Sequence, residues 1–407
     1  MRARTDDGSY TFEYRPGTIH HGAGVVEEIG TELDRHGRSR ALIVTDATLA
    51  GIGDVIDPIE AGVGDRLVGV FDGVTPEKYL KTASEGARRV HDEDVDALVA
   101  VGGGSSLDTA KLIAVLAGHG DPAAAAREMV DREAVLVPDD VPLTDIVAVP
   151  TTLPGAELSQ VAGVKLSLNP DGKSRSEIPS GGVSDARLMP TAIFHDVALF
   201  ATTPESVLAR SAMNGFDKGI EMLYTRHHNP LTDGTAIRGV RLLKEHLPSI
   251  TAESTSDADR SGILRGIAAA QYGLSTPNAY RASVIHSFGH AIARNYPVQQ
   301  GVAHAIAAPH VLRYLFEQVD GRRDLLAEAL DVDGADDEET AAAIVDAVAE
   351  VRDALDLPSN LRSVEGAERD HFPELARAVV DDPFMDAGPR DLDPDASEIE
   401  AVFERMW

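Results

Sequence analysis

Three consecutive glycines followed by two serines are the clearest chemical signal in this chain. The loop consists of Gly102, Gly103, Gly104, Ser105 and Ser106. It follows an apolar run and precedes a segment with helical spacing. Glycine lets the backbone approach a ligand closely, and a helix N-terminus offers free N–H groups and a positive dipole end to a phosphate. The pattern predicts a pyrophosphate-binding loop for a dinucleotide, with Asp108 as a further contact; the alternative is a tight turn in which a serine caps a helix.

Polar residues also stand where two other apolar runs end. Asp46 follows the run at 41–44, and Thr151 and Thr152 follow the run at 145–149. Because open α/β sheets bind ligands at the carboxyl ends of their strands, all three are predicted contacts of NAD or NADP. A carboxylate at Asp46 accepts hydrogen bonds from ribose hydroxyls and repels a 2′-phosphate, which favours NAD. The alternative for Asp46 is that it caps the next helix.

The first half of the chain, which carries these residues, alternates short apolar runs with helical periodicity. Strands are predicted at 41–44, 68–71, 97–101 and 145–149, and helices at 78–92 and 106–116. Such alternation produces a parallel sheet whose connections cross over it as helices. The segment at 163–185 interrupts the alternation and is predicted to be a loop or a hairpin.

The second half has long helical patterns and few β-branched runs. Helices are predicted at 204–224, 230–247, 257–275, 281–293, 301–319 and 340–355. Because single cores rarely exceed about 250–300 residues, a chain of 407 residues is expected to form two domains. The predicted fold is α/β, with a Rossmann-like parallel-sheet dinucleotide-binding domain at 1–203. An all-helical substrate and catalytic domain is predicted at 204–407.

The charge of the chain narrows its possible partners. It has 67 acidic and 37 basic residues, a formal net charge of −30 and a pI near 4.7, and only seven of the basic residues are lysines. Nucleic-acid binding needs a basic surface, so no nucleic-acid partner is expected. A halophilic surface explains the charge, because molar salt screens self-repulsion. A basic protein partner is the alternative.

Other features of the composition concern location. No apolar run reaches the roughly 20 residues that span a bilayer, the N-terminus lacks the apolar core of a signal peptide, and there is no cysteine. We therefore expect a cytoplasmic protein with no membrane partner, no disulfide and no cysteine-ligated zinc.

Taken in order, these segments resemble the iron-containing alcohol dehydrogenases and their relatives, among them maleylacetate reductases, glycerol dehydrogenases and dehydroquinate synthases. The resemblance covers nearly the whole chain. Its segments are Phe12–Gly24 (similar to an opening strand pair), Gly102–Lys111, Pro150–Glu157, Leu188–Asp196, His286–His290, Gly301–Ala305 and Pro309–His310. It implies a cleft between the two domains, with the nicotinamide facing the helical side. We also expect a homo-oligomer, a dimer, although no residue pattern specifies it.

The resemblance also identifies where a metal would bind. Members that carry iron or zinc supply an Asp and a His four residues apart on one helix, and two further His from a later helix pair. In a gapless match Asn214 takes the Asp position, Lys218 the first His position and Gln300 the last, so that only His286 is a standard ligand. An ammonium cannot ligate a dication, and amides supply no charge to offset it. The resemblance therefore implies a degenerate site without a catalytic metal.

Two alternatives concern the same residues. If the chain is aligned with the family in another register, Asp217 and Glu221 supply metal-binding carboxylates, because they stand four apart on one helical face. That register breaks the gapless match. The second alternative is that these residues have no catalytic role, in which case Lys218 is a solvated helix residue paired with Glu221. His286 and His290 are then core histidines with satisfied hydrogen bonds.

The first functional hypothesis is reversible hydride transfer between NAD(P)(H) and a small polar alcohol or carbonyl compound. Lys218 polarises the developing alkoxide in place of a metal, His290 or His286 handles the proton, and Asn214 belongs to the same catalytic site. The second is a lyase or cyclase similar to dehydroquinate synthase, which uses NAD as a transient oxidant and normally needs a metal. The third is a nucleotide-binding protein without turnover.

Overall fold

A six-stranded parallel sheet organises the first half of the chain in the computed structural model, which describes residues 10–13, 17–173, 177–252 and 254–407. The strand order is β1-β8-β5-β4-β2-β3. The strands are β1 (Thr18–Gly22), β2 (Ala41–Asp46), β3 (Leu67–Val74), β4 (Ala97–Gly102), β5 (Asp145–Pro150) and β8 (Ala192–Asp196). All four strands predicted from the sequence are present. Of the predicted opening strand pair, β1 is the strand found among the described residues; residues 14–16 of that segment lie outside them.

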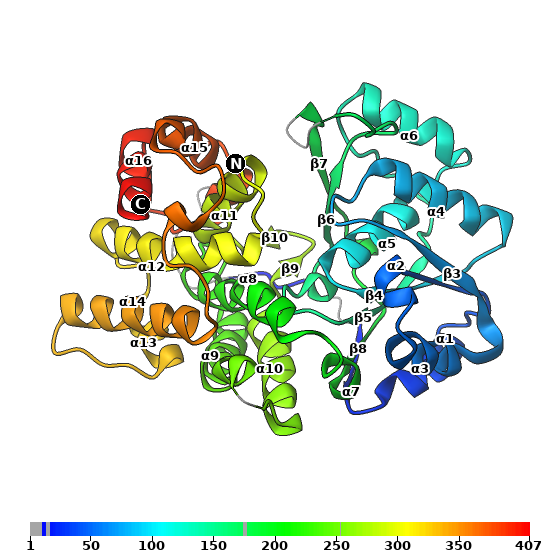
Figure 1. Ribbon diagram of the computed structural model, residues 1–407, viewed down its shortest axis with the longest axis horizontal. Helices are drawn as coiled ribbons and strands as arrows, with labels where there is room; N and C mark the ends of the chain where they lie inside the picture. Colours follow the sequence, from blue (N-terminus) through cyan, green and yellow to red (C-terminus); the bar gives the residue numbers. More distant parts are fainter. Residues whose placement is uncertain (1–9, 14–16, 174–176, 253) are drawn as a thin grey trace.

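Both faces of the sheet are covered, which explains why its central strands read as continuous apolar runs. Successive residues alternate between two cores: Ile43, Val99 and Val147 face one, and Leu42, Leu98 and Ile146 the other. The first core is completed by α1 (Ile29–Arg35) and α3 (Gly53–Val63), and the second by α4 (Leu80–Asp92), α5 (Gly104–Ala117) and α6 (Pro122–Asp131). Two short helices, α2 (Ala47–Ala50) and α7 (Val197–Phe200), follow β2 and β8. The predicted Rossmann-like architecture is confirmed (Figure 1).

An antiparallel hairpin lies beside this sheet. Strands β6 (Val161–Lys165) and β7 (Ser180–Ser184) pair with each other, and β6 packs on α5. The segment at 163–185, predicted to be a loop or a hairpin, therefore belongs to a hairpin.

The second half is mostly helical and lies on the other side of the molecule in Figure 1. Its helices are α8 (Glu205–Tyr224), α9 (Pro230–His246), α10 (Asp257–Ala270), α11 (Val284–Asn295), α12 (Gln300–Gln318), α13 (Arg323–Leu330), α14 (Asp337–Ala354), α15 (Phe372–Val380) and α16 (Ala396–Arg405). The prediction of an all-helical domain needs one correction, because β9 (Ser275–Thr276) and β10 (Ala279–Tyr280) form a small ribbon. The helix predicted to reach residue 275 ends at Ala270, and Gly273, three residues later, adopts a left-handed φ of 80°.

The two halves meet near the predicted boundary. The last strand of the sheet ends at Asp196 and α8 begins at Glu205, so a division at residue 203 falls between them and stays a prediction. In the part of the chain that the structure describes, no helix is long and apolar enough to cross a membrane.

Candidate active site

The glycine-rich loop presents bare backbone at the N-terminus of α5. Gly102 ends β4 with a φ of 131°, and a Cβ there would lie 2.6 Å from the hydroxyl of Ser106. Gly103 is the N-cap residue, and no side chain caps the helix there. Ser105 and Ser106 lie inside the first turn, so the alternative of a serine cap is wrong. The loop has the backbone access and the open helix N-terminus that a pyrophosphate requires.

The segment after β5 lies directly against this loop. The N–H of Thr151 donates to the carbonyl oxygen of Gly102 at 3.0 Å. A Cβ on Gly103 would come within 3.0 Å of the hydroxyl of Thr152. The structure thus brings together Gly102, Gly103, Thr151 and Thr152, which the sequence predicted as cofactor contacts. Their contact with a cofactor stays a prediction.

Two predicted carboxylates already have protein partners. Asp46 caps α2, with Oδ1 accepting from the N–H groups of Thr48 at 2.9 Å and Leu49 at 3.1 Å. The alternative that Asp46 caps the next helix is therefore confirmed. The predicted contact with a ribose stays a prediction, because the cap uses only Oδ1 and the carboxylate has a second oxygen. Asp108 Oδ2 accepts from Lys78 Nζ at 2.8 Å and from the N–H of Gly163 at 3.1 Å. Asp108 thereby joins α5 to the β6–β7 hairpin.

Helix α8 touches the segment after β5 from the opposite side. A Cβ on Gly215 would lie 2.2 Å from the carbonyl oxygen of Leu153. One turn later, Lys218 Nζ donates to the carbonyl oxygen of Pro154 at 2.6 Å. The residues from Thr151 to Pro154 therefore form a bridge with the glycine-rich loop on one side and the Lys218 ammonium on the other.

Lys218 is buried, with 6% of its surface exposed. Burial lowers the pKa of its amine to about 8, and the carboxylates of Glu157 and Asp108 oppose that shift. The alternative of a solvated lysine paired with Glu221 is wrong, because Glu221 instead binds His286.

Two buried acid–histidine pairs lie behind Lys218. Glu221 Oε2 is 2.5 Å from Nδ1 of His286, and Asp217 Oδ2 is 3.2 Å from Nδ1 of His304. The two imidazole rings meet edge to face with centroids 4.3 Å apart. Burial, reinforced by the Lys218 charge, lowers the pKa of both histidines well below the usual range, so the rings are neutral.

These pairs bear on two alternatives from the sequence. Asp217 and Glu221 each face a histidine, and no group of three or more His, Asp or Glu side chains arranged to hold a metal occurs within the described ranges. His286 is not a fully satisfied core histidine, because within those ranges its Nε2 is buried without a hydrogen-bond partner.

His290 is the more accessible of the two predicted catalytic histidines. Its side chain is 19% exposed, against 2% for His286, and the two ring centroids are 6.3 Å apart. Nδ1 of His290 lies 3.0 Å from Asp382 Oδ2, and the ring of Phe384 stands 4.8 Å away. His290 is therefore held at Nδ1, and part of its side chain is exposed.

The remaining two predicted positions lie on α8 and α12. Asn214 Oδ1 is buried and unpartnered in the described part of the structure. Gln300 begins α12, and its neighbour Gly301 packs on the carbonyl oxygen of Arg210, one turn before Asn214. The start of α12 thus packs against α8, the helix that carries Asn214.

Sequence reasoning missed two groups that contact predicted catalytic residues. Asp382 follows His290 by 92 residues, and no motif marks it. The Pro154 carbonyl belongs to the backbone, so no residue type signals its bond to Lys218.

Comparison with known proteins decides the family. A model of the iron-containing alcohol dehydrogenase family matches residues 16–196, and a model of the C-terminal part of that family matches residues 208–407. The chain belongs to the iron-containing alcohol dehydrogenase family. It is 29% identical to an NAD-dependent methanol dehydrogenase of Bacillus methanolicus, over 91% of this chain and 93% of that one. It is 27% identical to the lactaldehyde reductase of Escherichia coli K12, over 96% and 98% of the two chains.

A more distant protein shares the fold of this chain. A sulfoacetaldehyde reductase of Bifidobacterium kashiwanohense, solved in complex with NAD+, superposes with a TM-score of 0.81 at 17% identity, over 98% of this chain and 99% of that one. The iron-containing alcohol dehydrogenases are oxidoreductases, and the resemblance noted in the sequence is confirmed over both halves of the chain.

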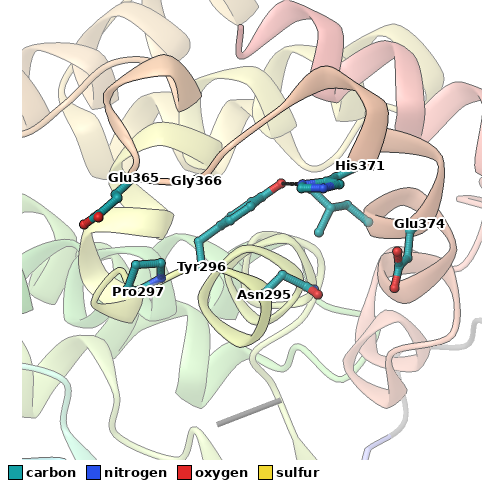
Figure 2. Close-up of a pocket in the computed structure, with 8 residues that line it drawn as sticks. Asn295, Tyr296, Pro297, Glu365, Gly366, His371 and Glu374 are labelled. Atoms are coloured by element: carbon teal, nitrogen blue, oxygen red, sulfur yellow. Dashed lines mark hydrogen bonds between the residues drawn. The ribbon is translucent and has the colours of Figure 1, made fainter. Parts of the chain in front are cut away.

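A cavity lies outside the predicted site. Figure 2 shows it beneath the segment that carries His371, with Glu365 and Glu374 on opposite sides and the Tyr296 hydroxyl 3.1 Å from His371 Nδ1. None of its described lining residues is a predicted cofactor or catalytic residue. It lies between the C-terminal end of α11 and residues 365–375, and no residue of the bridge described above lines it.

Proposed function

We propose that this protein catalyses reversible hydride transfer between NAD and a small polar alcohol or its carbonyl product. The observation that carries the proposal is the series of contacts from the glycine-rich loop, through Thr152 and Pro154, to Lys218 and the histidines behind it. A phosphate-binding loop and a set of proton-handling side chains are thereby joined by a few residues of backbone. The names of two relatives, a methanol dehydrogenase and a lactaldehyde reductase, support a substrate of this size. A homodimer remains part of the proposal.

The cofactor would bind along the glycine-rich loop. The open N-terminus of α5 would hold its pyrophosphate, and the NAD+ complex of a structural relative supports this choice of dinucleotide. When bound, the nicotinamide supplies the chemistry of accepting or returning a hydride.

We further propose that the chain works without a catalytic metal. Support comes from the residues at the family's ligand positions: two amides, a neutral histidine held at Nδ1, and a lysine whose ammonium is bonded to a carbonyl. This set fits a dication poorly, since it has no carboxylate and includes a cation. No step is therefore assigned to a metal.

Lys218 and His290 have separate roles in the proposed reaction. In alcohol oxidation the substrate carbon loses its hydrogen as a hydride and the hydroxyl loses a proton. The Lys218 ammonium stabilises the negative charge that develops on the oxygen, which is where an oriented donor is most effective. His290 takes the proton, because it is the catalytic histidine with an accessible face. Carbonyl reduction runs these transfers in reverse.

The test is net formation of NADH. The protein is incubated with NAD and, in turn, with methanol, two- to four-carbon diols and hydroxyaldehydes, at low and at molar KCl because we propose a salt-adapted surface. Absorbance in the reduced-nicotinamide band should rise in proportion to the alcohol consumed. A lyase with transient redox chemistry, or a binding protein without turnover, would leave no accumulated NADH with any substrate, and that result would contradict the proposal.

Asp46 should set the preference for NAD over NADP. Asp46→Ser removes the charge that opposes a 2′-phosphate but keeps an oxygen that can cap α2, so we expect stability to change little. The ratio of kcat/KM for NADP to that for NAD should rise at least about tenfold, as a loss of roughly 1.4 kcal/mol of repulsion implies. The matched control is Asp121→Ser, at another capping aspartate. An unchanged ratio in Asp46→Ser would show that Asp46 is a cap and nothing more.

A further inference from the structure

We infer that Asp382 is a positioning residue for catalysis, one that holds His290 in the tautomer with the proton on Nδ1. Nε2 is then the nitrogen that exchanges a proton with the substrate. This inference rests on the proposed function, because it concerns how the proton-handling histidine of that reaction is prepared. Asp382 is not among the residues for which the sequence predicted a role, although it lies within the part of the chain that the C-terminal family model matches.

The geometry around the Asp382 carboxylate shows which nitrogen of His290 carries the proton. Oδ2 lies 3.0 Å from His290 Nδ1 and 3.2 Å from Arg294 Nη1, and Oδ1 accepts from the N–H of Phe384 at 3.0 Å. The carboxylate side chain is 1% exposed. Arginine and a peptide N–H are donors only, so both oxygens already act as acceptors, and an ionised carboxylate can only accept from the third partner as well.

The ionisation of Asp382 agrees with that pattern. Burial raises the pKa of its carboxyl, but the hydrogen bond and charge of His290, together with the Arg294 guanidinium, outweigh burial and leave the pKa below the usual range. An ionised carboxylate has no proton to give. Nδ1 of His290 is therefore the nitrogen that donates to the carboxylate, so in the ring with a single proton Nε2 keeps a lone pair.

The segment that carries Asp382 is anchored well enough to hold this geometry. Asp382 is the N-cap of the 3-10 turn Pro383–Ala387. At the far end of the turn, the Ala387 carbonyl oxygen accepts from the Thr225 hydroxyl at 2.7 Å and from the N–H of Arg226 at 3.1 Å. These bonds tie the turn to the C-terminal end of α8, the helix that carries Lys218. Lys218 and Asp382, the acceptor of the His290 hydrogen bond, are thus both fixed to α8.

The arrangement has a chemical consequence in both directions of the reaction. In oxidation, the substrate hydroxyl proton moves to Nε2 while the hydride leaves carbon, and the imidazolium that forms is stabilised by the Asp382 carboxylate. In reduction, Nε2–H returns the proton to the carbonyl oxygen. A ring protonated on Nε2 instead would face the substrate with no lone pair and could not accept the proton.

The test compares three variants with the parent enzyme. Asp382→Asn keeps the shape of the side chain but can donate to Nδ1, so it no longer requires the productive tautomer. We expect kcat to fall about 10–100-fold, the range seen when a group that orients a functional histidine is removed, with the KM for NAD unchanged. His290→Gln should lose at least as much, and adding Asp382→Asn to it should cost nothing further, because Asp382 acts only through the ring. The control is Asp381→Asn, at the exposed neighbouring carboxylate.

Ring ¹⁵N resonances of His290, identified by their absence in His290→Gln, supply a readout that does not depend on turnover. The parent should show Nδ1 protonated, and Asp382→Asn should show a population protonated on Nε2. An unchanged tautomer in Asp382→Asn, an unchanged kcat, or an additional loss in the double variant would each overturn the inference. A His290→Gln variant with full kcat would instead overturn the role of His290 in the proposed function, and the resonances would still decide whether Asp382 sets its tautomer.

Discussion

Replacing Lys218 by methionine should lower kcat by about 100–1,000-fold, because a single oriented donor supplies roughly 2.7–4 kcal/mol of transition-state stabilisation. Methionine keeps the apolar stem of the buried side chain and removes the ammonium that bonds the Pro154 carbonyl oxygen. The affinity for NAD, measured by calorimetry, should change little, since Lys218 contacts the bridge on the side opposite the glycine-rich loop. Lys81→Met is the matched control, at a lysine on α4 whose side chain is 47% exposed.

The same hypothesis predicts how the parent enzyme responds to pH and to chelators. The Lys218 pKa of about 8 means that the ammonium is present below pH 8 and is lost as the pH rises through that value. The kcat for carbonyl reduction should fall over that interval, and EDTA should not inhibit at any pH. A metal bound in stoichiometric amount and lost together with activity on chelation would contradict the metal-free mechanism. A Lys218→Met enzyme with near-normal turnover would do so as well.

Placing a valine at Gly103 should weaken NAD binding by at least about 100-fold, or about 2.7 kcal/mol. The backbone of Gly103 is extended, with φ −84° and ψ −171°, so valine can adopt it without strain. Its Cβ would stand 3.0 Å from the Thr152 hydroxyl. Its methyl groups would then cover the N–H groups at the start of α5, which are the proposed pyrophosphate site.

Calorimetric titration with NADH measures this loss, and a thermal melt shows whether the fold survives. Gly120→Val is the control, because Gly120 is exposed and an added Cβ there meets nothing within 4 Å. If Gly103→Val binds NADH as tightly as the parent protein, the cofactor lies elsewhere and the proposed reaction loses its foundation.

The sequence by itself determined the architecture of the half of the chain in which we propose that the cofactor binds. The strands at 41–44, 97–101 and 145–149 were recognisable because both faces of a central parallel strand are buried, which requires an uninterrupted apolar run. The glycine-rich loop was recognisable because it must leave such a strand and enter a helix within a few residues. The prediction of the helical half was less complete. It did not include the ribbon at 275–280, because strands of two residues have no detectable periodicity.

The side-chain partnerships were decided only by the tertiary structure. Sequence spacing placed Asp217, Lys218 and Glu221 on one helix, yet a helix presents neighbouring residues in different directions. Lys218 reaches the Pro154 carbonyl of the sheet half, whereas Asp217 and Glu221 reach histidines on α12 and α11. Which neighbour each side chain meets depends on how α8 packs against three other segments, and no pattern along α8 alone contains that information.

Asp382 shows the same limit over a longer distance. A hydrogen bond between residues 92 positions apart has no sequence period, because the chain between them folds through α12 to α15 before it returns. The motifs in the sequence were enough to identify the oxidoreductase family to which the chain belongs. The contact that holds His290, to which we assign proton transfer, comes from a carboxylate that only the packed C-terminal segment brings to it.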